Sequence, residues 1–93
     1  MSYNLKFKKE ALKEWRKLDG NLRTQFKKKL KERLQNSCVL ASRLSGKKNR
    51  FKIKLRNAGY RLVYEVRESK FVVIVIVVGK RKNKIVYKTA AAR

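Results

Sequence analysis

The sequence predicts an α+β fold in which two helices pack on one face of a mainly antiparallel sheet, the other face being at least partly open. Apolar residues alternate with cations in 51–56, and a second alternating run, 60–66, follows an Asn-Ala-Gly turn, which is typical of a β-hairpin. Apolar residues recur at helical spacing between residues 9 and 36. The run at 71–78 is β-branched at nearly every position. A chain of 93 residues makes one domain, so we take 1–93 as a single unit.

The first third of the chain changes period once. Residues 2–8 alternate apolar and polar side chains and predict an N-terminal strand. From Lys9 the apolar residues fall on one helical stripe, which Asp19-Gly20-Asn21 is expected to break. The stripe comprises Leu12, Trp15 and Leu18. A second helix should end near Asn36 and form an antiparallel hairpin with the first. Its apolar positions, four residues apart, are Leu22, Phe26, Leu30 and Leu34.

The second half of the chain should build most of the sheet. Residues 37–49 read as a polar, basic connection before the hairpin. Because 71–78 is apolar on both parities, it is expected to be a strand buried on both faces, in the middle of the sheet. The segment from Lys84 to Arg93 could form a short C-terminal helix.

The charge of the chain points to a polyanionic partner. There are 28 Lys and Arg against 6 Asp and Glu, a net charge of +22, which favours nucleic acid or an acidic protein over a membrane surface. Cys38 is the only cysteine and is best read as a small apolar residue. The absence of a disulfide predicts a reducing compartment, the cytoplasm. The apolar run 71–78 is too short to cross a bilayer as a helix.

The parity of the hairpin gathers cations on one face. If Phe51, Ile53 and Leu55 pack against the helices, the opposite face carries Lys52, Lys54, Arg56 and Arg61, with Arg81 at the exit of the central strand. Such a face suits phosphate, for which arginine offers a bidentate fork. The alternative is a solvated basic surface that holds nucleic acid without chemistry.

Residue types limit the chemistry of such a face. The chain has no His, and its basic stretches lack a carboxylate cluster, so neither a metal nuclease nor His-based catalysis is expected. A metal-free route remains for RNA, because the 2′-hydroxyl is a nucleophile beside the scissile phosphate. Crowded cations favour a neutral lysine and a tyrosinate, so Lys54 and Tyr87 are both plausible bases.

Six segments together resemble the RelE toxins of bacterial type II toxin–antitoxin systems, within the RelE/ParE superfamily. They are ALKEWRKL at 11–18, KKKLKERL at 27–34, FKIKLR at 51–56, AGYRLVYEV at 58–66, VGKR at 78–81 and VYK at 86–88. The resemblance implies a toxin that cleaves mRNA in the ribosomal A site with the RNA 2′-hydroxyl as nucleophile and no metal or other cofactor. Two positions depart from the family pattern: Ser45 stands where arginine is common, and Ile85 where an acid is common.

The resemblance also assigns roles to residues of this chain. The catalytic set it implies is Lys52, Lys54, Arg61, Arg81 and Tyr87. Arg61 and Lys52 would hold the phosphate, and Arg81 would stabilise the transition state or protonate the leaving 5′-oxygen. Lys54 or Tyr87 would take the 2′-proton, and Tyr87 could stack on a base. Candidate RNA contacts are Lys27, Lys28, Lys29, Lys31, Arg43, Lys47, Arg56, Lys80 and Lys82.

The implied partners are the ribosome with its rRNA and mRNA, and an acidic RelB-like antitoxin that wraps the toxin and often displaces its C-terminal helix. The free toxin would be a monomer. Two other functions stay open: a ParE-like toxin that inhibits DNA gyrase by binding, and a non-catalytic RNA-binding module. The full catalytic set separates the first function from the second, because ParE-type chains are expected to lack it.

Overall fold

The computed structural model of the chain describes residues 3–35, 49–55, 57–80 and 85–93. In chain order the elements are β1 (Asn4–Phe7), α1 (Lys9–Arg16), α2 (Gly20–Gln35), β2 (Arg50–Leu55), β3 (Tyr60–Arg67), the 3-10 turn η2 (Glu68–Lys70), β4 (Val72–Lys80) and α3 (Ile85–Ala92). The strands form one sheet in the order β1-β4-β3-β2. β1 pairs with β4 in parallel, and the other two pairings are antiparallel. The predicted α+β architecture and the short C-terminal helix are confirmed.

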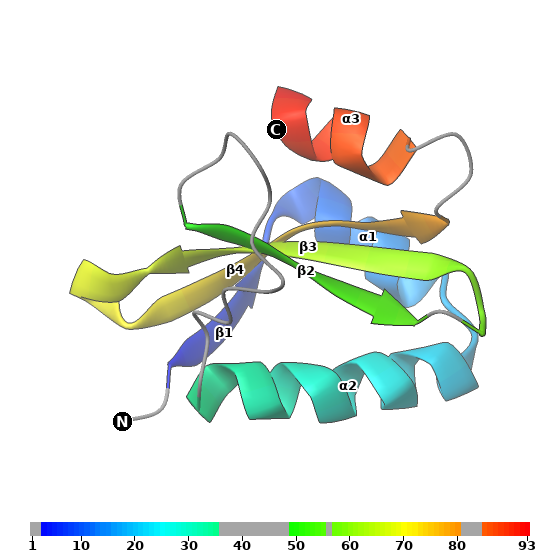
Figure 1. Cartoon of the computed structure of the whole chain (residues 1–93), viewed down its shortest axis with the longest axis horizontal. Helices are drawn as coiled ribbons and strands as arrows, with labels where there is room; N and C mark the ends of the chain where they lie inside the picture. The colour runs from blue at the N-terminus through cyan, green and yellow to red at the C-terminus, as the bar shows by residue number, and fades with distance from the viewer. Residues whose placement is uncertain (1–2, 36–48, 56, 81–84) are drawn as a thin grey trace.

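Helices lie on both sides of this sheet, with α2 and α3 on opposite sides (Figure 1). The larger core lies on the side of α1 and α2, where Phe26 and Leu30 are fully buried and Trp15 nearly so. The Trp15 ring lies 6.3 Å from the Phe26 ring and 5.3 Å from the Phe7 ring, measured between centroids. Trp15 and Phe26 are therefore core residues, as predicted.

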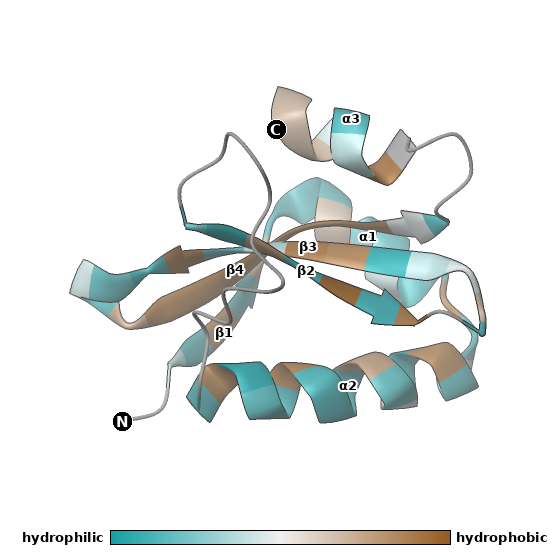
Figure 2. Cartoon of the chain, in the orientation of Figure 1, coloured by the Kyte–Doolittle hydropathy of each residue, from teal (hydrophilic) through white to brown (hydrophobic). Residues whose placement is uncertain are grey.

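β4 is one of the two interior strands, as its apolar sequence predicted, and it is coloured as hydrophobic along most of its length (Figure 2). Its pairing with β3 slips between Val63, which faces Val77, and Tyr64, which faces Val75. The extra residue is Ile76, and both Ile76 and Val77 belong to the smaller apolar cluster on the side of α3. This bulge thus gives α3 two adjacent apolar side chains to pack against.

The first helix is shorter than predicted. It ends at Arg16, so Leu18 lies in the connection, although its side chain is still buried. Gly20 and Asn21, expected to break the helix, are instead the first residues of α2. The physical reason is that Asp19 begins a helix: its carbonyl oxygen accepts the backbone N–H of Arg23 at 3.0 Å. The predicted strand at 2–8 is confirmed as Asn4–Phe7, and α2 ends at Gln35, close to the predicted Asn36.

Two predictions, the basic connection and the lack of a membrane-spanning helix, can be compared only with the described residues. The predicted basic connection, Cys38 included, lies almost wholly outside the described residues. Across the ranges that the structure does describe, no helix has the length and apolar character needed to cross a bilayer.

Candidate functional site

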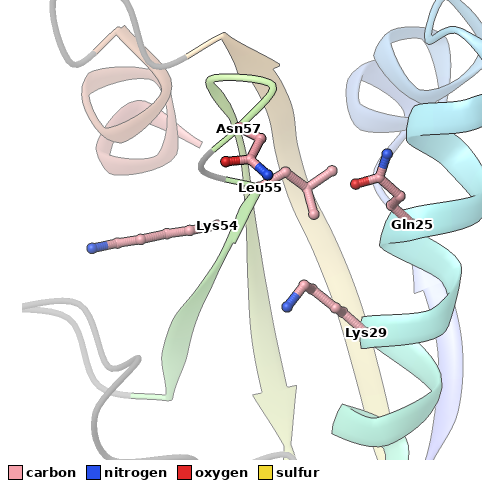
Figure 3. A pocket seen from close by; sticks show the side chains of 5 residues that line it. All are labelled: Gln25, Lys29, Lys54, Leu55 and Asn57. Carbon is pink, nitrogen blue, oxygen red and sulfur yellow. The ribbon is translucent and has the colours of Figure 1, made fainter.

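The β2–β3 hairpin divides its side chains between the two faces of the sheet as predicted. Phe51, Ile53 and Leu55 are buried in the larger core. Lys52 and Lys54 alternate with them and are half-buried on the opposite face. In Figure 3 the Lys54 side chain points away from α2, whereas that of Leu55 points toward it. The turn closes at Gly59, whose φ of 69° suits glycine.

Register brings a third cation to the same face. Arg61 lies directly opposite Lys54 on the neighbouring strand, and Val63 lies opposite Lys52. Residues paired in this way have Cβ atoms about 5 Å apart, so two positive charges are held side by side. On its other side Arg61 faces Gly79 of β4, where no side chain competes for space.

Arg61 is a buried cation. Its side chain and backbone together are 6% exposed, and its Nη1 donates to the carbonyl oxygen of Tyr60 at 2.9 Å. Within the described residues, its Nε is buried without a hydrogen-bond partner, and no ion pair includes it. An unpaired buried charge is costly, so this site favours an anionic ligand.

Helix α3 places an aromatic ring beside these cations. Val86 and Ala90 pack on Val63, Ile76 and Val77 of the sheet. Gly79 permits this approach, because a Cβ there would stand 3.3 Å from Cγ2 of Val86. One residue along, Tyr87 presents its ring to Lys52, whose Nζ lies 6.0 Å from the ring centroid.

An ion-paired group at the start of β2 fixes the far end of α3. Arg50 Nε donates to Glu65 Oε1 at 3.1 Å, Arg67 Nε donates to Glu65 Oε2 at 2.9 Å, and Arg50 Nη1 also donates to the carbonyl oxygen of Ala90. Partial burial raises the pKa of Glu65, but the hydrogen bonds and charges of Arg50 and Arg67 outweigh it and hold that pKa below its ordinary value. Sequence reasoning missed Arg50, although its phase with Lys52 and Lys54 puts it on their face.

A second arginine supports the site from the side of α2. Arg33 donates from Nη1 to the buried hydroxyl of Tyr64 at 2.9 Å and to the carbonyl oxygen of Lys52 at 3.4 Å. Its guanidinium also lies 5.8 Å from the Tyr64 ring centroid. These hydrogen bonds connect α2 to the β2 backbone at Lys52. The four-residue spacing of the apolar side chains of α2 gave no signal for this contact, since Arg33 is one position before the apolar stripe residue Leu34.

The structure separates the predicted site residues into two groups. Lys52, Lys54, Arg61 and Tyr87 come together on the α3 side, and we call these four residues the cationic site. Lys27, Lys28, Lys29 and Lys31 are exposed on α2, on the other side of the sheet. Lys80 is exposed, and its pairing with Tyr60 puts it on the α2 side rather than with the cationic site. Arg43, Lys47, Arg56, Arg81 and Lys82 lie outside the described residues.

A pocket between α2 and the β2–β3 turn lies apart from the cationic site. Gln25, Lys29, Leu55 and Asn57 line it together with part of Lys54. The Lys54 side chain points to the opposite face of the sheet (Figure 3). Its amine therefore belongs to the cationic site and not to this pocket.

Comparisons with known proteins agree with this geometry. The model of a family described as the ParE toxin of type II toxin–antitoxin systems matches residues 5–85. The chain is also 52% identical over 93 residues to the mRNA interferase toxin RelE of Escherichia coli K12, covering 100% of this chain and 98% of that protein. The chain belongs to the RelE/ParE family of toxins. The mRNA interferase RelE of Shigella flexneri matches equally well, with the same identity and coverage.

Solved structures of this family share the fold. A double arginine-to-alanine mutant of E. coli RelE in the free state superposes with a TM-score of 0.92 at 50% identity, covering 100% of this chain and 98% of that one. RelE in the intact E. coli RelBE toxin–antitoxin complex gives a TM-score of 0.85 at 51% identity, covering 88% of this chain and 100% of that one. The predicted membership of the RelE toxins is confirmed.

Proposed function

We propose that this chain is a ribosome-dependent mRNA endoribonuclease toxin that cleaves the message in the A site and so inhibits translation. The observation that carries the proposal is Arg61, a buried guanidinium without an acidic partner among the described residues, held opposite Lys54. RNA supplies the missing anion as a phosphate. The relatives named mRNA interferase support RNA cleavage as the activity.

The cationic site has the groups that metal-free RNA cleavage requires. Arg61 and Lys52 hold the scissile phosphate and stabilise the charge that develops on its oxygens. The 2′-oxygen attacks phosphorus as its proton passes to a base, and the bond from phosphorus to the 5′-oxygen breaks. That oxygen takes a proton, so the products are a 2′,3′-cyclic phosphate and a 5′-hydroxyl, and no water is consumed.

Two residues of the site are candidates for the base. The Lys54 amine extends from β2 beside Arg61, and the Tyr87 hydroxyl extends from α3 beside Lys52. The Tyr87 ring would also stack on a base of the message. Arg81, the residue after the last of β4, would neutralise the transition state or protonate the leaving oxygen.

The partners of the toxin follow from its charge. The exposed lysines of α2 would bind rRNA and dock the toxin on the ribosome, while the opposite face meets the message. An acidic RelB-like antitoxin would bind the free toxin, a monomer, in the cytoplasm. The solved RelBE complex, whose toxin chain is 51% identical, supports this pairing.

Primer extension on a defined message in a reconstituted translation reaction tests the proposal. Wild type, Arg81→Ala and Lys54→Ala are compared with and without ribosomes. Lys13→Ala is the matched control, because it removes one exposed cation of α1. We expect A-site cuts that need ribosomes and that are lost in Arg81→Ala and Lys54→Ala alone.

The outcomes separate this function from the alternatives. Ribosome binding without cuts would contradict the nuclease and leave an RNA-binding module. Intact message together with inhibited supercoiling by DNA gyrase would instead support ParE-like activity, the function suggested by the name of the matching family model.

A further inference from the structure

Helix α3 carries Tyr87, yet little in the helix itself fixes its position. It has eight residues, too few to be stable alone. Its buried side chains, as far as the structure describes them, are Val86 and Ala90, which are small. The position of the Tyr87 ring over Lys52 therefore depends on polar contacts at the other end of the helix.

One of those contacts is the hydrogen bond from Arg50 to the carbonyl oxygen of Ala90, and the others converge on Arg93, the residue after α3. Its Nη1 and Nη2 donate to Glu14 Oε1 and Oε2 of α1 at 2.9 and 3.1 Å, a bidentate pair. Arg93 Nη1 also donates to the carbonyl oxygen of Ile76 at 2.9 Å, and Lys8 Nζ donates to the carbonyl oxygen of Arg93 at 2.9 Å. Both partners of the ion pair are partly shielded, with side-chain exposures of 18% for Arg93 and 31% for Glu14.

The sheet explains why this pair is well placed. β1 pairs with β4 only as far as Val75, so among the described residues the next part of the β4 edge has no neighbouring strand. There Glu14 Oε1 accepts the backbone N–H of Val78 at 3.2 Å, while Arg93 donates to Ile76. The pair thus bridges α1, the open edge of β4 and the end of α3. Ile76 is the extra residue of the bulge on which α3 packs, and Val78 lies two residues beyond it.

We propose that Glu14 and Arg93 form a latch that holds α3 against the sheet, and that Glu14 is a positioning residue for cleavage acting through Tyr87. This inference rests on the proposed function. When the latch is closed, α3 stays on the sheet and the Tyr87 ring stays at Lys52. When it is open, α3 occupies that position for a smaller fraction of the time, and cleavage slows by that fraction.

Glu14→Gln is the sharpest test, because the amide oxygen can still accept from Val78 while the charge for Arg93 is gone. Glu10→Gln is the matched control, an exposed acid in the first turn of the same helix. With ribosome-bound message we expect Glu14→Gln to lower kcat roughly fivefold and to leave the half-saturating ribosome concentration unchanged. Glu10→Gln should cleave like wild type. Arg93→Gln should match Glu14→Gln, and the double variant should be no slower than either.

Two further readouts distinguish positioning from general stability. In a Tyr87→Ala background, followed in single turnovers at excess toxin, Glu14→Gln should have no further effect. Hydrogen exchange of the free toxin should show faster exchange of the α3 amides in Glu14→Gln, with β3 and β4 unchanged. An equal loss of rate in the Tyr87→Ala background, or faster exchange throughout the sheet, would overturn the latch and leave Glu14 a structural residue.

The test also separates failure of the latch from failure of the proposed function. If wild type does not cut ribosome-bound message, the nuclease proposal fails, whereas hydrogen exchange still reports on the contact between Glu14 and α3. If wild type cuts and Glu14→Gln has the wild-type kcat, the latch is wrong and the nuclease proposal stands.

Discussion

The two faces of the sheet differ in what they bury: one buries a large apolar core, and the other a small apolar cluster beside cations. On the side of α1 and α2, large apolar side chains such as Phe26, Leu30 and Tyr64 are fully buried in one continuous core. On the side of α3 the apolar cluster is small, and next to it lie Arg61, Lys54 and Lys52. The first face supplies most of the hydrophobic stabilisation, and this permits the second to keep a buried cation. Stability and the proposed chemistry are thus assigned to different sides of one sheet.

The largest effect on stability is expected from a truncation on the α2 side. Phe26→Ala should lower the free energy of unfolding by about 3–5 kcal/mol, because it leaves a cavity in the larger core. Below its unfolding temperature, cleavage per folded molecule should stay near that of wild type, since Phe26 is remote from the cationic site. Urea unfolding and an activity assay at low temperature check both parts. A folded but inactive Phe26→Ala would break the division between the two faces.

Arg61→Met should separate the two properties most clearly. Arg61 is a buried charge without an acidic partner among the described residues, so replacing it by an apolar side chain of similar length should stabilise the free protein by roughly 1–3 kcal/mol. The same change removes a phosphate ligand, so the cleavage rate should fall by roughly 100-fold. Thermal unfolding and primer extension are measured on the same samples, with Lys13→Met as the control. A variant that is less stable than wild type would mean that Arg61 already has a compensating partner in the free toxin.

Val86→Ala should act on the α3 side alone. The loss of two methyl groups should cost about 1.5 kcal/mol of the packing of α3 on the sheet. Because α3 makes only a small apolar contact with the sheet, we expect this loss to appear as faster hydrogen exchange within α3 and as slower cleavage. Urea unfolding of the sheet should change little. Thr89→Ala, a change on the same helix at a partly exposed position, serves as the control. An equal acceleration of exchange in β3 would show that α3 and the sheet unfold as one unit.

The smallest expected effect is a pH dependence of stability that arises from Glu65 and its two arginine partners. The pKa of Glu65 is lowered in the folded state, so its ion pairs stabilise the fold above the ordinary carboxyl pKa, and this contribution is lost as pH falls through the lowered value. Glu65→Gln should therefore be less stable than wild type near neutral pH, by less than about 1 kcal/mol. The difference should vanish once the pH is well below the lowered pKa of Glu65. A difference that persists in acid would mean that the hydrogen bonds of Glu65, and not its charge, stabilise the fold.

The sequence predicted the strands and the cationic face well because both follow from period two. Lys52, Lys54 and Arg61 needed only the alternation of the hairpin and the position of its turn. The same alternation could not show that Arg61 is buried or that Gly79 leaves room for α3, because these depend on register with β4. The end of the first helix was misplaced because the break was expected at Asp19-Gly20-Asn21, whereas the helix ends at Arg16 and Asp19 directly precedes α2, where its carbonyl oxygen accepts the N–H of Arg23.

Contacts between segments far apart in the chain were beyond the sequence patterns. Glu14 and Arg93 are separated by most of the chain, and only the open edge of β4 brings them together. Arg33 reaches Tyr64 across the layer between α2 and the sheet. In both cases the sequence showed a charged residue on a helix or at its end, without a signal for its partner.

The central claim is that the cations of the α3 side carry out cleavage while those of α2 only bind. The most direct test titrates ribosome–message complexes and compares Lys54→Ala with a variant in which Lys27, Lys28, Lys29 and Lys31 are all alanine. We expect Lys54→Ala to lower the maximal rate by roughly 100-fold at a nearly unchanged half-saturating concentration. The variant with four alanines in α2 should have a higher half-saturating concentration and the wild-type maximal rate. The reverse pattern, a binding defect for Lys54→Ala and a lost maximal rate for the α2 variant, would contradict the account.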